Sequence, residues 1–213
     1  MGRGPVGAPA IIRYVNNSLA SVTDVSGIDD SMVLIKEQTA SSSSTINFVH
    51  GTSDVVLDST YPVYLFKWIS VHPSANDVAY AFNGSIDAGS NYNVTKTTAM
   101  YYAYHDEGDT TTTLAYGGAE DLAQSTGFCR VNFNVGNGAD EEAGGELWLF
   151  NPSSTTYVKH FIARTWTQRQ DNVLDNFISG YFNDTNDVDA IQFKPESGTF
   201  DAGTFKLYGI KDS

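Results

Sequence analysis

The chain has 213 residues and a formal net charge of −13, because 25 acidic side chains outnumber 12 basic ones. This charge excludes most nucleic-acid binders, which neutralise phosphates with Lys and Arg, and it opposes contact with anionic membranes. No apolar run is long enough for a transmembrane helix, and aromatic residues, which favour strands, make up 13% of the chain. We therefore expect a globular protein that neither binds nucleic acid nor inserts into a membrane.

Residues 1–30 differ in composition from the rest of the chain. Glycines and prolines between Gly2 and Pro9 oppose a regular element, and a short apolar piece, Ala10–Val15, follows them. This segment is either a frayed tail or, as we favour, an arm that docks on a neighbouring protein. The docking residues that we expect are Arg3, Ile11, Ile12, Arg13 and Tyr14. The segment has no apolar core of a secretory signal peptide, so we expect synthesis in the cytoplasm.

Residues 31–213 form a second segment, in which short β-rich runs alternate with turn residues. The predicted strands are Met32–Gln38, Thr45–Val49, Val63–Val71, Val78–Asn83, Ala99–His105, Phe128–Asn134, Glu146–Phe150, Tyr157–Gln168, Phe177–Phe182, Ala190–Lys194 and Thr204–Ile210. Alternation is strict in the run from residue 157 to 168. One face of that run carries His160, Ile162 and Trp166, and the other carries Lys159 and Phe161, which is the period-two pattern of a half-buried strand.

The separators between these runs carry turn chemistry. Asn83-Gly84 and Ala88-Gly89 accept the positive φ of tight turns, Asn151–Ser154 stops one strand, and Ser197–Gly203 links the last two. One helical turn is conceivable at Ala119–Gln124. Many strands with regular turns and no helices between them predict an all-β fold, an antiparallel β-sandwich of the jelly-roll type with an irregular N-terminal arm.

The residue types that usually carry catalysis or metal binding are scattered. Cys129 lies in an alternating run and is interpreted as a small buried hydrophobe. His160, in the middle of a strand, is interpreted as a packing or interface residue. The acidic run after His105 (Asp106, Glu107 and Asp109) is typical of a solvated hairpin tip, with a cation or acid–base site as the less favoured alternative.

A second acidic segment raises the possibility of calcium, which prefers several oxygen ligands. Asp184, Asn186, Asp187 and Asp189 are close in sequence, but an EF-hand starting at Asp184 would need glycine and glutamate where Asp189 and Pro195 stand. Another kind of calcium loop stays open. We predict no catalytic residue, no cofactor and no metal, since the chain also has no nucleophile elbow and no phosphate-binding loop.

Carbohydrate binding is a further possibility, because jelly-roll folds often bind sugars through exposed aromatic side chains. The candidate contacts are Tyr92, Tyr101, Tyr102, Tyr104 and Trp148. The simpler interpretation is that these strand aromatics are divided between the core and an interface.

Four sequence stretches carry a resemblance to known proteins. They are LIKEQTASSSSTINF (Leu34–Phe48), AFNGSIDAGSNYNVTKT (Ala81–Thr97), LFNPSSTTYVKHFIA (Leu149–Ala163) and FDAGTFKLYGI (Phe200–Ile210). With them, residues 32–211 resemble a family of β-rich structural proteins of tailed bacteriophages, especially marine ones. The resemblance implies a virion component and brings no catalytic motif with it.

Together these observations predict a non-enzymatic structural protein on the outside of a tailed-phage virion, made in the host bacterial cytoplasm. It would be a capsid decoration (cement) protein or a short fibre or tail component that contacts capsid or tail proteins. Strand-rich proteins with large aromatic faces readily form closed symmetric oligomers, and we predict a homotrimer. The alternatives are a module that binds host surface glycans and, less favoured, an enzyme that degrades polysaccharides.

Overall fold

The computed structural model describes residues 13–15, 18–21 and 31–211. Contacts between Cα atoms divide the chain into residues 1–31 and residues 32–213. In the first unit, β1 (Arg13–Val15) pairs antiparallel with β2 (Ser18–Ser21), so the predicted arm is not irregular throughout. Arg3, Ile11 and Ile12 lie outside the described residues, as do the side chains of Arg13 and Tyr14, and the docking role of this segment stays a prediction.

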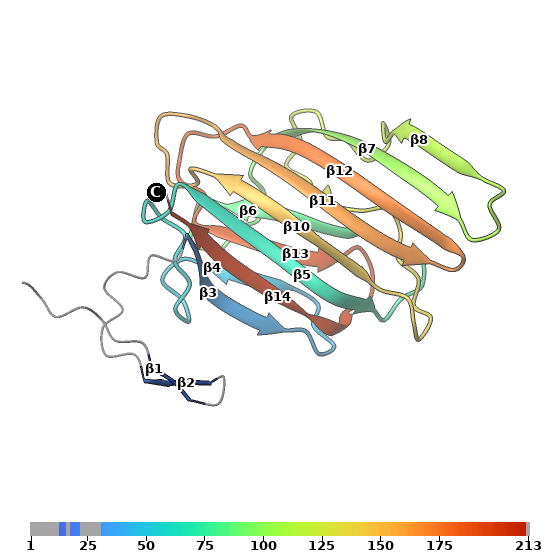
Figure 1. Cartoon of the computed structure of the whole chain (residues 1–213). Helices are drawn as coiled ribbons and strands as arrows, with labels where there is room; N and C mark the ends of the chain where they lie inside the picture. The colour runs from blue at the N-terminus through green and yellow to red at the C-terminus, as the bar shows by residue number, and fades with distance from the viewer. Residues whose placement is uncertain (1–12, 16–17, 22–30, 212–213) are drawn as a thin grey trace, which may run out of the picture. The chain divides into compact units, whose positions relative to one another are not determined.

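The second unit consists of two antiparallel sheets packed face to face, and the larger sheet is nearer the viewer in Figure 1. The larger sheet has eight strands, in the spatial order β3 (Met32–Thr39), β14 (Phe200–Ile210), β5 (Val63–Pro73), β10 (Ala143–Phe150), β11 (Lys159–Arg169), β12 (Asn172–Phe182), β7 (Lys96–Asp106) and β8 (Thr112–Tyr116). The smaller sheet has four, in the order β4 (Ile46–Val49), β13 (Ala190–Pro195), β6 (Tyr80–Ser85) and β9 (Cys129–Arg130). The predicted antiparallel β-sandwich is confirmed, while its jelly-roll type stays a prediction.

The core lies between the two sheets and is rich in aromatic rings. Phe193 of β13 is at its centre, with its ring centroid 5.7 Å from that of Phe66 and 5.6 Å from that of Trp68 on the larger sheet. It also contacts Phe82 of the neighbouring strand β6, at 6.2 Å. Aromatic pairs at such distances add to the hydrophobic effect, so this cluster holds the two sheets together without a disulfide.

Side chains alternate between two faces of β11 as predicted, but the buried face is not uniformly apolar and the exposed face is not uniformly polar. The face with Phe161 is buried, and it includes Lys159, whose Nζ donates to the carbonyl oxygen of Asp184 at 3.1 Å. The opposite face is solvent-exposed and carries Ile162 and Trp166, each 48% exposed. The strand therefore turns large apolar side chains away from the core.

Two parts of the larger sheet were not predicted. Strand β8 lies at the sheet edge and its residues are mostly exposed. It therefore lacks the alternating apolar residues by which a half-buried strand is recognised in a sequence. Strand β12 begins five residues earlier than predicted, directly after a two-residue turn in which Gln170 has φ 54°. That turn lacks the Asn-Gly or Asp-Gly pair by which tight hairpins are usually detected.

The predicted turns have mixed outcomes. Ala88 and Gly89 have φ 57° and 76°, so the turn there is confirmed. Asn83-Gly84 is not a turn: both residues are buried inside β6, and a Cβ on Gly84 would lie 3.0 Å from Cζ of Phe182. Glycine is needed there for close packing. The segment Ala119–Gln124 contains a hydrogen-bonded turn rather than a helix, and only Cys129–Arg130 of the predicted strand Phe128–Asn134 pairs as β-structure.

In residues 31–211 and the two short strands before them, no helix could span a membrane.

Candidate functional site

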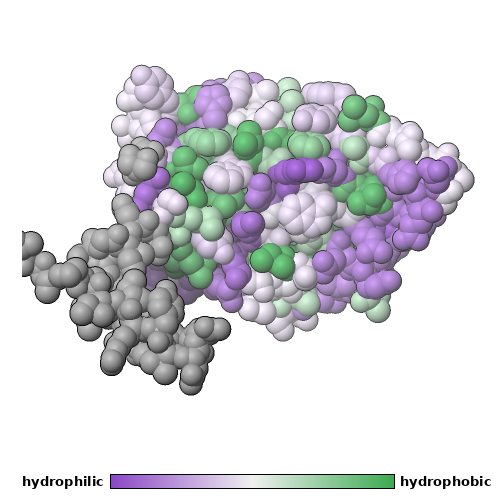
Figure 2. Space-filling view, viewed as in Figure 1, coloured by the Kyte–Doolittle hydropathy of each residue, from purple (hydrophilic) through white to green (hydrophobic). Residues whose placement is uncertain are grey.

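Two surfaces of the larger sheet have features of binding sites. We call the surface that faces away from the smaller sheet the outer face. It is formed by alternate residues of all eight strands. Among the described residues, every exposed large apolar side chain other than Ile86 and Tyr157 lies on the outer face: Met32, Leu34, Ile69, Tyr101, Leu114, Tyr116, Ile162, Trp166 and Val173. Figure 2 views this face and shows apolar side chains gathered among polar ones over the central strands.

Strand register places the apolar residues of the outer face in continuous rows. Leu34, Tyr208, Leu65, Trp148 and Ile162 are successive cross-strand partners from β3 to β11. The neighbours cover Leu65 so well that it is only 3% exposed, although it points away from the core. Side chains that pack across a sheet in this way form an ordered surface rather than isolated exposed groups.

A row of ion pairs runs beside the apolar row. Lys206 contacts Glu37 at 2.9 Å, and Lys67 lies 3.9 Å from Glu146. Further along, Arg164 makes a two-point contact with Asp175, with its closest N–O distance at 2.6 Å. Each cation on this row has an anionic partner on the same face.

An aromatic pocket lies where these two rows meet β12 and β7. The rings of Tyr101 and Phe177 are stacked at 4.8 Å, and the Arg164 guanidinium lies 4.9 Å from the centre of the Phe177 ring. With Trp148 and Ile162, these side chains line a cavity of about 400 Å³. Aromatic rings with an arginine are the residue types that dominate binding energy at protein interfaces.

The second surface is on the opposite side of the sheet, where β7, β8 and β12 extend past the smaller sheet. Along β7 the inward side chains change from buried Met100 to half-buried Tyr102 and Tyr104. These two tyrosines, with Phe133 and Leu174, line a cavity of about 340 Å³, which we call the tyrosine pocket. Its rim consists of Thr111, Thr113, Asn134 and Arg169.

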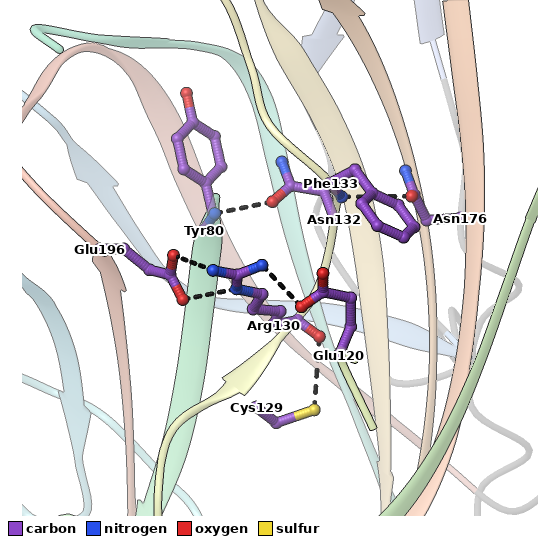
Figure 3. A network of polar contacts seen from close by, with 8 residues as sticks. All are labelled: Tyr80, Glu120, Cys129, Arg130, Asn132, Phe133, Asn176 and Glu196. Atoms are coloured by element: carbon purple, nitrogen blue, oxygen red, sulfur yellow. Dashed lines mark hydrogen bonds and ion pairs between the residues drawn. The ribbon is translucent and has the colours of Figure 1, made fainter. Parts of the chain in front are cut away.

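Buried amide side chains fix one wall of the tyrosine pocket (Figure 3). The Asn132 side-chain oxygen accepts a hydrogen bond from the Tyr80 backbone N–H at 2.7 Å, and that of Asn176 accepts one from the Phe133 backbone N–H at 3.2 Å. Both asparagines are fully buried. They hold the segment after β9 in place, so that the Phe133 ring packs edge-on against Tyr102 with 4.3 Å between centroids.

An ion-pair bridge supports the same segment from the β9 side. Arg130 contacts Glu120 at 2.6 Å and both carboxylate oxygens of Glu196 at 2.6 Å, as Figure 3 shows. These carboxylates raise the pKa of Arg130, which keeps the guanidinium charged. Cys129, next to it, is buried as predicted, and burial raises its pKa to about 12. A thiol with such a pKa is a poor nucleophile near neutral pH.

The predicted glycan contacts do not form one site. Tyr101 and Trp148 line the outer-face cavity, while Tyr102 and Tyr104 line the tyrosine pocket. Tyr92 lies in neither, and its backbone oxygen accepts a hydrogen bond from the buried Asn83 side chain at 2.7 Å. The two faces alternate along β7, so adjacent tyrosines in the sequence serve different surfaces.

The acidic segments are held by local hydrogen bonds. Asp106 accepts from the backbone N–H groups of Thr110 and Thr111, at 2.8 and 3.0 Å, and from the Thr110 hydroxyl. These bonds lower the pKa of Asp106 to about 2. The Asp184 carboxylate accepts a hydrogen bond from the Asn186 backbone N–H at 2.8 Å. Within the described residues, no three His, Cys, Asp or Glu side chains come together as metal ligands.

Several residues of both surfaces were missed in the sequence. Phe133, Arg169 and Leu174 carry no local signal, because long-range strand pairing brings them beside the tyrosines. For the outer face the sequence did contain a signal. His160, interpreted as a packing or interface residue, alternates onto the same strand face as Ile162 and Trp166.

Comparison with known proteins gives no match to any protein-family model, curated protein or solved structure. The resemblance to phage structural proteins therefore stays a proposal.

Proposed function

We propose that this chain is a non-enzymatic structural protein of a tailed-phage virion, with a jelly-roll domain that assembles as a homotrimer through the outer face. The observation that carries the assembly is the concentration of exposed apolar side chains on that one face. Large apolar patches are uncommon on the surface of monomeric proteins and mark sites of association.

Charge favours a second copy of this chain as the occupant of the outer face. The whole chain carries −13, so two copies repel each other over most of their surfaces. On the outer face the cations Lys67, Arg164 and Lys206 are matched by Glu37, Glu146 and Asp175. This balance makes the outer face a surface on which acidic copies can approach each other without a large electrostatic cost.

The size of the outer face is also suitable. At standard strand spacings, eight strands are roughly 34 Å wide, and seven residues along each are about 24 Å long. The resulting area, on the order of 800 Å², is what each partner contributes to a standard stable interface. In a closed ring of three, each copy would divide this area between its two neighbours, so each pairwise contact would bury roughly 400 Å² per partner and the trimer would depend on closure of the ring.

Oligomeric state tests the assembly directly. We expect the purified chain to have the mass of three 23.1 kDa subunits by light scattering after size exclusion. Ile162→Glu places an unpaired charge at the β11 end of the apolar row, beside the aromatic pocket, and should give monomers. Tyr157→Glu is the matched control, because Tyr157 is 74% exposed but lies off the outer face. A monomeric wild type, or a trimeric Ile162→Glu variant, would contradict the proposal.

The virion role rests on the sequence resemblance and has its own test. We expect mass spectrometry of purified particles of the encoding phage to find the chain in the virion. Deletion of residues 2–15 should remove the chain from particles while leaving the trimer of the soluble protein intact, because docking is assigned to residues 1–30. Normal incorporation of the deletion variant into particles would refute the hypothesis that residues 1–30 dock the chain on the virion.

A further inference from the structure

We infer that the tyrosine pocket is a binding site for a neutral sugar unit of a surface glycan. The site goes beyond the proposed structural role and is independent of it, since the pocket and the outer face are on opposite sides of the sheet. It is built from Tyr102, Tyr104, Phe133 and Leu174, with Asn134 and Arg169 at the rim.

The walls of the pocket suit the apolar faces of a pyranose ring. Tyr102 and Phe133 meet at an interplanar angle of 64°, so their rings form a corner rather than a flat stack. Leu174 is buried to 7% exposure and closes the floor between them and Tyr104. Sugar rings carry C–H groups on one face and hydroxyls around the edge, so they bind where aromatic walls and polar rims occur together.

The rim supplies hydrogen-bonding groups that are still available. Among the residues that the structure describes, none hydrogen-bonds to the hydroxyls of Tyr102 and Tyr104 or to the side-chain amide of Asn134. Thr111 and Thr113 add exposed hydroxyls at the edge formed by β8. Donors and acceptors at several angles around an apolar floor match the ring of hydroxyls of a sugar.

Charge points to a neutral sugar rather than an acidic one. Arg169 is the cation at the rim, and its Nε is 2.5 Å from Oδ1 of Asp77, so its charge is already paired. The net charge of −13 repels carboxylated or sulfated sugars. A volume of about 340 Å³ is at the small end for ligand pockets, which suits a terminal unit or one unit of a longer chain.

The pocket is preorganised for this role. Phe133 is held through its backbone by the fully buried Asn176, and the neighbouring Asn132 is held by Tyr80. A wall fixed by buried hydrogen bonds loses little conformational entropy when a ligand binds, and this raises the affinity available to a small site.

A glycan array tests the inference. The full-length protein would be applied to an array of bacterial capsular and lipopolysaccharide glycans, neutral and acidic, and each hit would be titrated by calorimetry. Tyr104→Ala should weaken binding to the neutral hit by about tenfold or more. Tyr101→Ala is the matched control, because its side chain is three residues away on the same strand but on the outer face, and binding should be unchanged.

Each outcome decides the inference. Binding to a neutral glycan that is lost in Tyr104→Ala and kept in Tyr101→Ala, with unchanged thermal unfolding of both variants, supports it. Binding to no glycan, binding to acidic glycans alone, or loss in Tyr101→Ala with retention in Tyr104→Ala overturns it. Calorimetry with a soluble monovalent glycan measures the affinity of each pocket separately, and this affinity does not depend on the oligomeric state, so the proposed assembly is tested separately.

Discussion

The buried pair Lys96 and Cys129 leads to a prediction about how stability depends on pH. Lys96 is fully buried at the start of β7, and its Nζ donates to the carbonyl oxygen of Gly127 at 2.6 Å. Burial lowers the pKa of Lys96 from 10.5 to about 8 and raises that of Cys129 from 9.0 to about 12. Both groups lie at the base of β9, the strand that leads into the wall of the tyrosine pocket.

The two groups act on stability in opposite directions. The lowered pKa of Lys96 means that the unfolded chain holds this proton up to about pH 10.5, whereas the folded protein releases it near pH 8. Its contribution to the free energy of unfolding therefore rises with pH, by about 2 kcal/mol between pH 8 and 10. Cys129 is the reverse case, because the folded thiol keeps a proton that the unfolded chain loses above about pH 9. Its contribution falls by about 1 kcal/mol over the same range.

Single variants should separate these effects. The free energy of unfolding of Lys96→Met should decline from pH 8 to 10 relative to wild type, and that of Cys129→Ala should increase. Urea unfolding followed by tryptophan fluorescence at pH 8, 9 and 10 measures both, and the other titrating groups cancel in the comparison between variants. The double variant serves as the control and should lie between the two. Parallel pH curves for the two single variants would refute the assignment of buried, oppositely shifted groups.

Three further predictions concern single positions. Asn176→Ala removes the acceptor for the backbone N–H of Phe133 and should lower the free energy of unfolding by about 1–3 kcal/mol in urea titrations. Gly84→Ala brings a Cβ to 3.0 Å from the Phe182 ring, so we expect a loss of about 1–3 kcal/mol by the same measurement. Asp106→Asn should flatten the decline in thermal stability between pH 4 and 2, because the contribution of Asp106 is lost as the pH falls from its unfolded pKa of 3.8 through its folded pKa of about 2.

Most strands could be predicted from the sequence, because a strand that packs on the core has inward side chains at every second position. In β11, and in the parts of β14 and β5 outside their bulges, every second residue points inward, and this leaves a period-two pattern that local inspection finds. Strand β8 contributes nothing to the core, so its sequence carries no such constraint. Its pairing with β7 is specified by the backbone ladder and by the turn that Asp106 organises.

Which face of a strand is buried was harder to predict than the alternation itself. On β11 the buried face includes Lys159, whose ammonium reaches a backbone carbonyl at the sandwich edge, while Ile162 and Trp166 face outward. A lysine can occupy an inner position when its head group has an acceptor and its stem packs among apolar side chains. Hydropathy alone therefore ranks the two faces of this strand incorrectly, and the proposed interface is based on these outward apolar residues.

The tyrosine pocket could be predicted only in part for a related reason. Tyr102 and Tyr104 are visible as candidates, but nothing local separates them from Tyr101, which points to the other side of the sheet. The wall and floor come from segments far away in the sequence, at Phe133 and Leu174. Their positions depend on the order of strands and on a buried asparagine, and neither follows from composition or spacing.

The two proposed surfaces are compatible because they share a sheet without sharing a face. Assembly through the outer face would bury Tyr101 and leave the tyrosine pocket of each subunit open on the outside of the particle. A pocket of about 340 Å³ can bind one sugar unit only weakly. If the proposed trimer forms, three such pockets would bind a repeating glycan with an effective affinity well above that of one pocket, and further copies on a virion would extend the effect. In this arrangement trimerisation would serve both the strength of the particle and its attachment to a surface.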